Sequence, residues 1–177
     1  MSFQTLLQGE RVRLRPLEER DLPYLCRWEQ DPVVDKFWGS KFQHSPRPEM
    51  WLADLQGSSH RRGFAIETKA GLLIGDLQLE DIDHRQGTAE LRICIGHDGF
   101  RGQGMGTEAV SLAAEYAFSQ LDLRALYVRV DLANWQAIRC YHKCGFVAEG
   151  ILARPGRRGR TMALMVLKRG GDGPVVL

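Results

Sequence analysis

The residues best suited to chemistry lie in a glycine-rich loop between a strand pattern and a helix pattern. Apolar residues alternate at Leu91, Ile93 and Ile95, which is typical of a strand. The loop Arg101-Gly-Gln-Gly-Met-Gly106 then leads into an alanine-rich run with helical spacing. Its glycines let backbone N–H groups approach a ligand, and the start of the following helix adds unpaired N–H groups and a positive dipole end. This order of strand, loop and helix predicts a site for phosphate or pyrophosphate.

Two familiar phosphate-binding loops do not fit this spacing. A P-loop needs a lysine before its Ser or Thr, whereas Thr107 directly follows Gly106. A dinucleotide fingerprint needs Gly-x-Gly-x-x-Gly, and Gly104-Met105-Gly106 does not continue in that way. A glycine-rich turn without a ligand is the structural alternative. The pattern present, Arg101-x-x-Gly104-x-Gly106, resembles that of the GNAT superfamily of acetyl-CoA-dependent N-acetyltransferases, whose loop amides hold the pyrophosphate of coenzyme A.

A second motif and a looser N-terminal pattern extend the resemblance over nearly the whole chain. The segment Asn134-Trp-Gln-Ala-Ile-Arg-Cys-Tyr-His-Lys-Cys-Gly-Phe146 resembles the GNAT signature near the C-terminus. Asn134 and Tyr141 stand two helical turns apart in it, so they share one helix face. The pattern Arg13-Leu-Arg-Pro-Leu, together with Asp21, Trp28 and Phe37-Trp-Gly, resembles the branch that includes ribosomal-protein N-terminal alanine acetyltransferases.

The resemblance implies that a primary amine directly attacks the acetyl carbonyl of acetyl-CoA through a tetrahedral intermediate, with no metal. The cofactor is expected between two splayed strands, at residues 90–95 and 125–130. A backbone N–H near Ile93, Cys94 or Ile95 is expected to polarise the carbonyl. Asn134 is expected to bind the pantetheine arm or to orient neighbouring groups. The residues expected at the pyrophosphate are Arg101, Gly102, Gln103, Gly104, Met105, Gly106 and Thr107.

The catalytic candidates are Tyr141 and Glu90. Tyr141 is the candidate general acid, because the leaving thiolate needs a proton and a phenol can supply it; a packed tyrosine with a wet hydroxyl is the alternative. Glu90 is the candidate base, because it is opposite in phase to the apolar residues of its strand and is expected to face the acceptor side. Asp76, Glu80 and Asp81 are further options. A solvated or salt-bridged carboxylate is the alternative for each, and water can relay the proton instead.

Composition indicates a single globular domain. The chain has 177 residues, 44% of them hydrophobic and 26% charged, with a net charge of +2. This near-neutral balance gives no sign of a nucleic-acid partner, and no long apolar run or signal peptide is present, so a cytoplasmic protein without membrane contact is expected. The four cysteines show no Cys-x-x-Cys pair, and reduced thiols that mainly pack are expected.

The elements that must position these residues predict an α/β (α+β) fold of GNAT type. We expect a mixed, mostly antiparallel central sheet of six to seven strands, flanked by about four helices, with splayed strands at the acetyl-CoA cleft. The expected domain spans residues 1–169, and 170–177 is expected to be a flexible tail. Strands are expected near 11–15, 64–68, 72–79, 88–95, 126–130, 146–152 and 161–167, and helices near 18–29, 48–55, 107–121 and 134–145. Asp31-Pro32 is expected to stop the first of these helices.

The acceptor is the least determined part of the site. A protein N-terminal α-amine is the first expectation, and an aminoglycoside or polyamine is the alternative. Carboxylates at Asp76, Glu80, Asp81, Asp83 and Glu90 suit any cationic amine and do not separate these substrates. A non-catalytic acyl-CoA-binding regulatory module is the rival from another class, although it would not need Tyr141. A monomer and a homodimer both stay open.

Two further segments have more than one interpretation. Phe37-Trp38-Gly39 either lines the acceptor cleft or closes the edge of the core. Arg154, Arg157, Arg158 and Arg160 crowd the last hairpin, which indicates either a solvated turn or contact with an acidic partner or cofactor phosphate.

Overall fold

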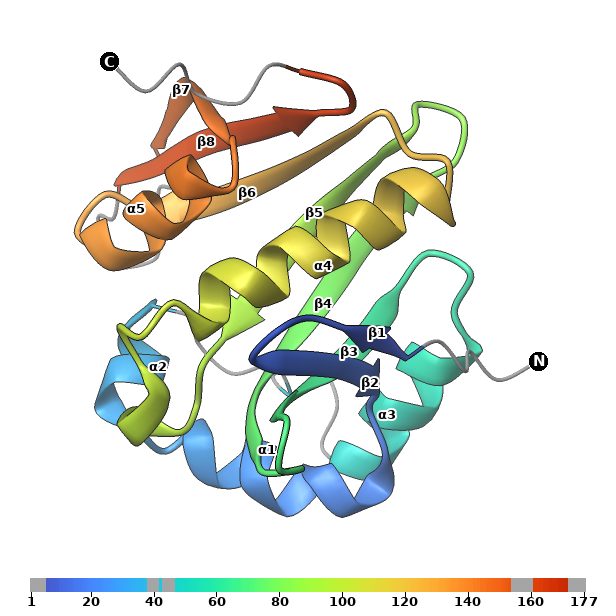
Figure 1. Ribbon diagram of the computed structural model, residues 1–177, viewed down its shortest axis with the longest axis vertical. Helices are drawn as coiled ribbons and strands as arrows, with labels where there is room; N and C mark the ends of the chain where they lie inside the picture. The colour runs from blue at the N-terminus through green and yellow to red at the C-terminus, as the bar shows by residue number, and fades with distance from the viewer. Residues whose placement is uncertain (1–5, 38–41, 43–46, 154–160, 172–177) are drawn as a thin grey trace.

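Eight strands form one sheet in the computed structural model, which describes residues 6–37, 42, 47–153 and 161–171 (Figure 1). Their order across the sheet is β1-β2-β3-β4-β5-β6-β8-β7. All neighbours are antiparallel except β5 and β6, which are parallel. The strands are β1 (Leu7–Gln8), β2 (Val12–Pro16), β3 (Arg62–Thr68), β4 (Leu73–Asp83), β5 (Thr88–Cys94), β6 (Ala125–Asp131), β7 (Val147–Ala153) and β8 (Thr161–Lys168).

Helices cover both faces of this sheet. The longest, α4, links the parallel pair β5 and β6 and crosses the front of the sheet in Figure 1. None of the helices in the described part of the chain is long and apolar enough to cross a membrane. The helical segments are η1 (Glu19–Asp21), α1 (Leu22–Trp28), α2 (Pro32–Phe37), α3 (Pro48–Gly57), η2 (Asp98–Phe100), α4 (Met105–Ser119) and α5 (Trp135–Lys143).

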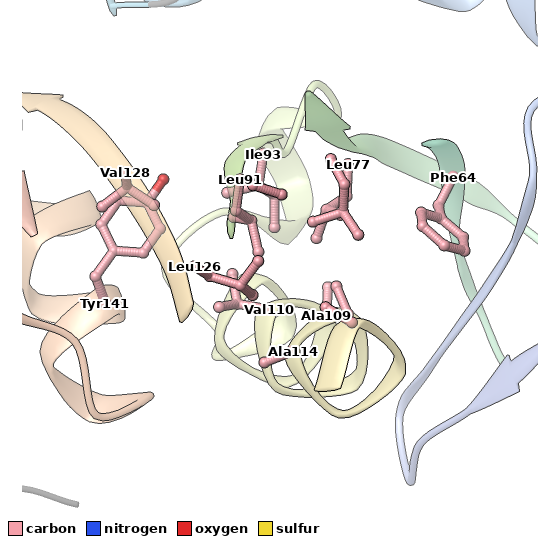
Figure 2. Packing of buried hydrophobic residues seen from close by; sticks show 14 of the residues in the cluster. Phe64, Leu77, Leu91, Ile93, Ala109, Val110, Ala114, Leu126, Val128 and Tyr141 are labelled. Carbon is pink, nitrogen blue, oxygen red and sulfur yellow. The ribbon is translucent and has the colours of Figure 1, made fainter. Parts of the chain in front are cut away.

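The main core lies between the sheet and α4. Strand alternation sends Leu77 and Leu91 to the same face, where both side chains are fully buried. Helical spacing presents Ala109 and Val110 to them from α4, as Figure 2 shows. The alanines let the helix approach the sheet closely, which places the N-terminus of α4 next to the end of β5.

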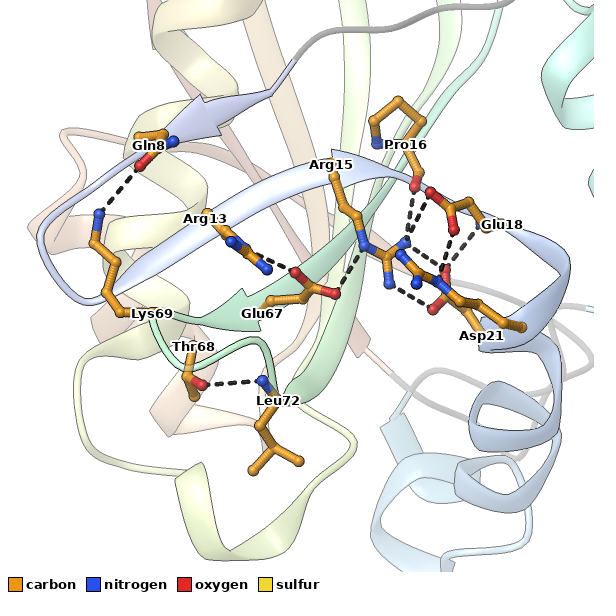
Figure 3. A network of polar contacts seen from close by, with 11 residues as sticks. Gln8, Arg13, Arg15, Pro16, Glu18, Asp21, Glu67, Thr68, Lys69 and Leu72 are labelled. Carbon is orange, nitrogen blue, oxygen red and sulfur yellow. Dashed lines mark hydrogen bonds and ion pairs between the residues drawn. The ribbon is translucent and has the colours of Figure 1, made fainter.

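A smaller core lies on the opposite face, where α1 and α3 cover β3. Ala65 points there because it is out of phase with Phe64 and Ile66. Beside this core, Arg15 joins β2 to the helical layer: its guanidinium bonds both oxygens of Asp21 at 2.7 Å and Glu67 at 2.7 Å (Figure 3). The Arg15 side chain is only 11% exposed, so this network holds a buried charge in place between β2 and the helical layer.

The observed elements confirm the expected fold class and differ from the expected ones mainly near the N-terminus. The sheet has eight strands because the two-residue strand β1 pairs with β2, and a segment this short leaves no periodic signal. The helix expected at 18–29 is divided into η1 and α1, and a further helix, α2, begins at Pro32, where the sequence was expected to stop a helix. Proline is well tolerated at the first helical position, and Asp31 accepts a hydrogen bond from the N–H of Val33 at 2.7 Å.

Candidate active site

The glycine loop gives the candidate site a row of backbone N–H groups. Gly104 is the residue before α4 and has a left-handed backbone, with φ of 82°, which glycine adopts without the steric cost of a side chain. The first intrahelical bond runs from the N–H of Glu108 to the carbonyl of Gly104 at 3.1 Å. The N–H groups of Met105, Gly106 and Thr107 therefore precede the hydrogen-bonded part of the helix, which is the arrangement that binds a pyrophosphate.

The side chain of Arg101 bonds to neighbouring parts of the protein. Its Nε donates to the carbonyl of Ile95 at 2.8 Å, and its Nη2 donates to the carbonyl of Gly96 and to the Asp31 carboxylate, both at 2.9 Å. Its own backbone N–H donates to the carbonyl of Asp98. Arg101 thus fixes the end of β5 to the start of α2, and its expected contact with the cofactor stays a prediction.

Trp28 and Asp31 are positioning residues that sequence analysis missed. A Cβ at Gly96 would lie 2.0 Å from Cδ2 of Trp28, so the indole packs directly against this glycine. The guanidinium of Arg101 and its hydrogen bond to Asp31 hold the pKa of that carboxyl below its usual value. No periodicity in the sequence pairs residues of the first helices with a loop so far along the chain, because the contact depends on tertiary packing.

A second missed contact fixes the other side of the loop. The carboxylate of Glu108 in α4 accepts hydrogen bonds from the backbone N–H groups of Glu10, Arg11 and Val12, in the turn between β1 and β2. The guanidinium of Arg11 in turn donates to the carbonyl of Gln103. The loop is therefore held from both sides, which is a condition for a preorganised anion site.

The parallel strands β5 and β6 separate where the acetyl group is expected. Their pairing runs from Thr88 opposite Ala125 to Glu90 opposite Tyr127. Beyond that pair, β5 continues against β4 as far as Cys94, and β6 continues against β8 as far as Asp131. This divergence, visible in Figure 1, confirms the expected splay and puts the backbone of Ile93, Cys94 and Ile95 on one side of the gap.

Tyr141 enters this region from α5. Its side chain is buried, its ring centroid lies 5.5 Å from that of Phe146, and it belongs to the cluster that includes Ile93, Met105 and Val128. Figure 2 shows the ring against β6, with its hydroxyl directed toward the β5 side. Burial raises the pKa of the Tyr141 phenol, so the hydroxyl stays protonated at neutral pH and is available as a donor.

Glu90 lies on the opposite face of β5 and is paired with Arg129 of β6. Arg129 Nε donates to Glu90 Oε1 at 2.9 Å, and Arg129 Nη2 donates to Oε2. This bidentate pair is buried at its carboxylate end, where the Glu90 side chain is 5% exposed. The hydrogen bond to Glu90 raises the pKa of Arg129. The arrangement is the salt-bridged alternative that the sequence left open, and the role of Glu90 as the base stays a prediction.

The face that carries Glu90 also holds two of the other carboxylates expected near the acceptor, Asp76 and Glu80. Asp76 and Gln78 of β4 are 3% and 5% exposed, and Gln78 Nε2 donates to Asp76 Oδ2 at 3.1 Å. The amide oxygen of Gln78 is buried and has no hydrogen-bond partner among the residues that the structure describes. Glu80 is paired with Arg61 and Arg92. In the described chain, no group of three or more His, Cys, Asp or Glu side chains is arranged to hold a metal ion.

Asn134 and Thr107 mark where α5 meets the start of α4. The amide oxygen of Asn134 accepts a hydrogen bond from the N–H of Ala137 at 3.2 Å and thereby caps α5. The hydroxyl of Thr107 donates to the sulfur of Cys140 at 3.4 Å. The side chains of both residues make structural contacts, so the backbone N–H of Thr107 and the amide group of Asn134 are the parts left for a ligand.

The structure therefore brings most of the expected site together and divides it between two faces. The loop, the end of β5 and Tyr141 border the gap between β5 and β6, whereas Glu90 points to the opposite face of the sheet. Phe37 ends α2, with the charged nitrogen of Lys36 4.8 Å from its ring centroid. Trp38, Gly39 and the arginines expected in the last hairpin lie outside the described residues.

Comparisons with known proteins fit this geometry. The family model described as the acetyltransferase (GNAT) domain matches residues 11–147. A spermidine N(1)-acetyltransferase from Escherichia coli (strain K12) is 37% identical over 149 residues, covering 80% of this chain and 75% of that protein. One from Vibrio cholerae is 28% identical over 146 residues, covering 81% and 83%. The crystal structure of spermidine N-acetyltransferase from Vibrio cholerae, in complex with CoA and spermine, superposes with a TM-score of 0.78 at 24% identity and covers 90% of this chain and 96% of that one.

Proposed function

Because the chain belongs to the GNAT acetyltransferase family, and is thus an acetyl-CoA-dependent N-acetyltransferase, we propose that its acceptor is a primary amine of a spermidine-like polyamine. The relative from Escherichia coli carries this proposal, since it is named for spermidine and shares 37% of its residues over most of both chains. The same relatives favour the polyamine alternative over the protein N-terminal amine and over the N-terminal alanine acetyltransferase branch first expected from the sequence.

The buried hydrogen-bond acceptors of β4, which are oxygens of Gln78 and Asp76, support a cationic substrate. A buried amide oxygen without a donor is costly, and the oxygen of Gln78 is in this state beside the carboxylate of Asp76. An ammonium group offers three donors, one of which would satisfy the amide oxygen of Gln78, and a positive charge that the nearby Asp76 carboxylate would attract. A neutral or an anionic substrate would match Gln78 and Asp76 less well, because a carboxylate prefers a cation.

Each part of the site has a role in the proposed reaction. Acetyl-CoA supplies the acetyl thioester, and its pyrophosphate would be held by the N–H groups of Met105, Gly106 and Thr107. A backbone N–H at the end of β5 would stabilise negative charge on the carbonyl oxygen. Tyr141 would donate the proton that the thiolate needs on leaving, and Glu90 or water would take the proton from the amine.

The test is free-thiol release from acetyl-CoA with a panel of amines. The panel contains spermidine, a peptide beginning with alanine, an aminoglycoside and a simple monoamine. We expect the highest kcat/KM with spermidine, at least about tenfold above the others, which corresponds to about 1.4 kcal/mol of transition-state discrimination. A peptide or an aminoglycoside that reacts faster than spermidine would replace the polyamine as the acceptor.

A pair of variants connects this result to the structure. Gln78→Met removes the unpartnered amide and keeps the length of the side chain, whereas Gln86→Met makes the same change at an exposed position. We expect Gln78→Met to raise the KM for spermidine by about tenfold, because hydrogen bonds to charged groups contribute about 1.5–3 kcal/mol. Gln86→Met should leave this KM unchanged. An equal effect of the two variants would remove Gln78 from the acceptor site.

A further inference from the structure

Two cysteines that the proposed reaction does not use form a close pair on α5. Cys140 and Cys144 are four residues apart, so their side chains lie on the same face of the helix. Both are partly exposed and pack against the main core. Both sulfurs contact the same residue, Thr107 of α4. A pair of adjacent thiols differs chemically from a single cysteine, because one soft atom can bond to both sulfurs at once.

Polar groups of α4 hold this pair in place. Thr107 Oγ1 donates to the sulfur of Cys140 at 3.4 Å, and Ser111 Oγ donates to the sulfur of Cys144 at 3.7 Å. The thiol of Cys144 donates to the carbonyl of Thr107 at 3.4 Å. Hydrogen bonds from Cys144 and Thr107 lower the pKa of the Cys140 thiol to about 7, with a smaller effect from the charge of Lys143. The lowered pKa favours the thiolate form of Cys140, which is its nucleophilic form.

The pair also touches both halves of the candidate cofactor site. Thr107 contacts both sulfurs and lies in the first turn of α4, whose N–H groups are proposed to bind the pyrophosphate. Tyr141, the proposed acid, directly follows Cys140 in α5. The backbone N–H of Cys144 donates to the carbonyls of Cys140 and Tyr141 at the end of the helix. A change at the two sulfurs therefore acts on the loop and on the acid together.

We propose that Cys140 and Cys144 form a dithiol site for a soft, thiophilic electrophile that bonds to both sulfurs, and that occupation of this site weakens cofactor binding. The class of ligand is a trivalent arsenical or a similar thiophilic centre. An atom bound across the two sulfurs removes the hydrogen bonds between the thiols and Thr107. The first turn of α4 then loses its contact with α5.

The chemistry of this step requires no oxidant. With an organoarsenic(III) oxide, each sulfur forms one S–As bond, the arsenic–oxygen bond breaks, and the oxygen leaves with the two thiol protons as water. A direct disulfide fits less well, because Cβ atoms four residues apart on a helix are about 5–6 Å apart, whereas a disulfide needs about 3.5–4.5 Å. A bridging atom spans the larger separation without displacing the end of α5.

The experiment uses phenylarsine oxide on the full chain, with intact-mass measurement and calorimetric titration of coenzyme A. We expect one phenylarsenic group per chain, released by a dithiol but not by a monothiol. Coenzyme A affinity of the adduct should fall by about tenfold, within the usual range of coupling between sites. Cys140→Ser and Cys144→Ser should each lose the dithiol-specific adduct, whereas Cys26→Ser, a change at a partly exposed cysteine in α1, should keep it.

Three results would overturn the proposal. An adduct that persists in Cys140→Ser and in Cys144→Ser would place the reactive thiols elsewhere. A stable adduct at the pair with unchanged coenzyme A affinity would separate the pair from the cofactor site. Formation of a Cys140–Cys144 disulfide with oxidised glutathione, in preference to the arsenic adduct, would contradict the geometric argument. The mass measurement is independent of acetyl transfer, so it stands whichever amine is the acceptor.

Discussion

Tyr141 shows how burial suits a phenol to donate a proton rather than to lose one in advance. Its raised pKa keeps the hydroxyl protonated, and its position against β6 brings it to the gap where the thiolate is expected. We expect Tyr141→Phe to lower kcat by about 10²- to 10⁴-fold, the usual contribution of a general acid. Coenzyme A affinity should stay close to that of the parent, because the ring and its packing are retained.

The control for this variant is Tyr116→Phe. Tyr116 is also buried, but it packs edge-on against Phe64 in the core, away from the gap between β5 and β6. Tyr116→Phe tests whether the loss of any buried hydroxyl lowers kcat by destabilising the protein. Steady-state kinetics and calorimetry on both variants separate the two effects, and an unchanged kcat in Tyr141→Phe would remove the acid role.

Glu90 makes a different prediction, because its carboxylate is already oriented by Arg129. A base accepts the proton of the amine during the reaction, so its removal should slow the chemical step. Glu90→Gln should lower kcat/KM by about 10²-fold or more, mainly through kcat. Steady-state kinetics with spermidine at saturating acetyl-CoA measures this change. A raised KM with an unchanged kcat would assign Glu90 to substrate binding, with water as the base.

At this scale, the sequence predicts the residues that carry a local signature. The glycine loop and the spacing from Asn134 to Tyr141 are read directly from the chain. The contacts of Arg129, Trp28 and Asp31 were not found, because only strand register or tertiary packing brings each of them close to its partner. The phase of Glu90 on its strand was predicted correctly, but the residue opposite it was not.

The start of α4 is the element on which the cofactor site depends. Gly104 has φ of 82°, and a side chain in that left-handed conformation costs about 1–2 kcal/mol. A Cβ at Gly106 would lie 3.7 Å from Ile95 and 3.8 Å from Ile93, which is ordinary contact. We expect Gly104→Ala to weaken coenzyme A binding by about tenfold as the loop relaxes, while Gly106→Ala binds nearly as the parent does. Calorimetric titration compares them, and equal affinities would show that the left-handed turn is not needed.

Long elements with strong periodicity were predicted well, and short ones were not. The pattern from Val110 to Leu121 gave α4, whose first turn at Met105 extends further back than the apolar spacing indicates. β1 and α2 were missed because two residues and six residues carry too little periodicity. Pro32 was interpreted as the end of a helix, although α2 begins there. The dipeptide Asp31-Pro32 can both end one helix and cap the start of the next.

On the scale of the whole molecule, two cores meet at the end of β5. The larger core lies under α4, and the smaller one lies between β3 and the helices α1 and α3. Trp28 packs against Gly96, and Asp31 binds Arg101, so the helical layer touches the loop that leads to the cofactor site. The domain boundary at residue 169 and the state of assembly stay predictions.

Asp31→Asn tests this connection between the two parts. Asparagine can still accept the hydrogen bond from Val33 but cannot pair with the charge of Arg101. The pKa of Asp31 is lowered in the folded state, so its contribution to stability is present above its unfolded value of about 3.9 and is lost as pH falls through the folded value. The parent should therefore be more stable than the variant at pH 7, and this difference should disappear in strong acid.

The measurement is denaturant unfolding of the parent and the variant across the acid range, with Asp35→Asn as the control on the exposed side of α2. The same samples are titrated with coenzyme A at neutral pH. Because Arg101 also holds the carbonyls of Ile95 and Gly96, loss of its partner should lower coenzyme A affinity in Asp31→Asn and not in Asp35→Asn. A stability difference that persists unchanged into strong acid would mean that the carboxylate of Asp31 does not join the helical layer to the cofactor loop.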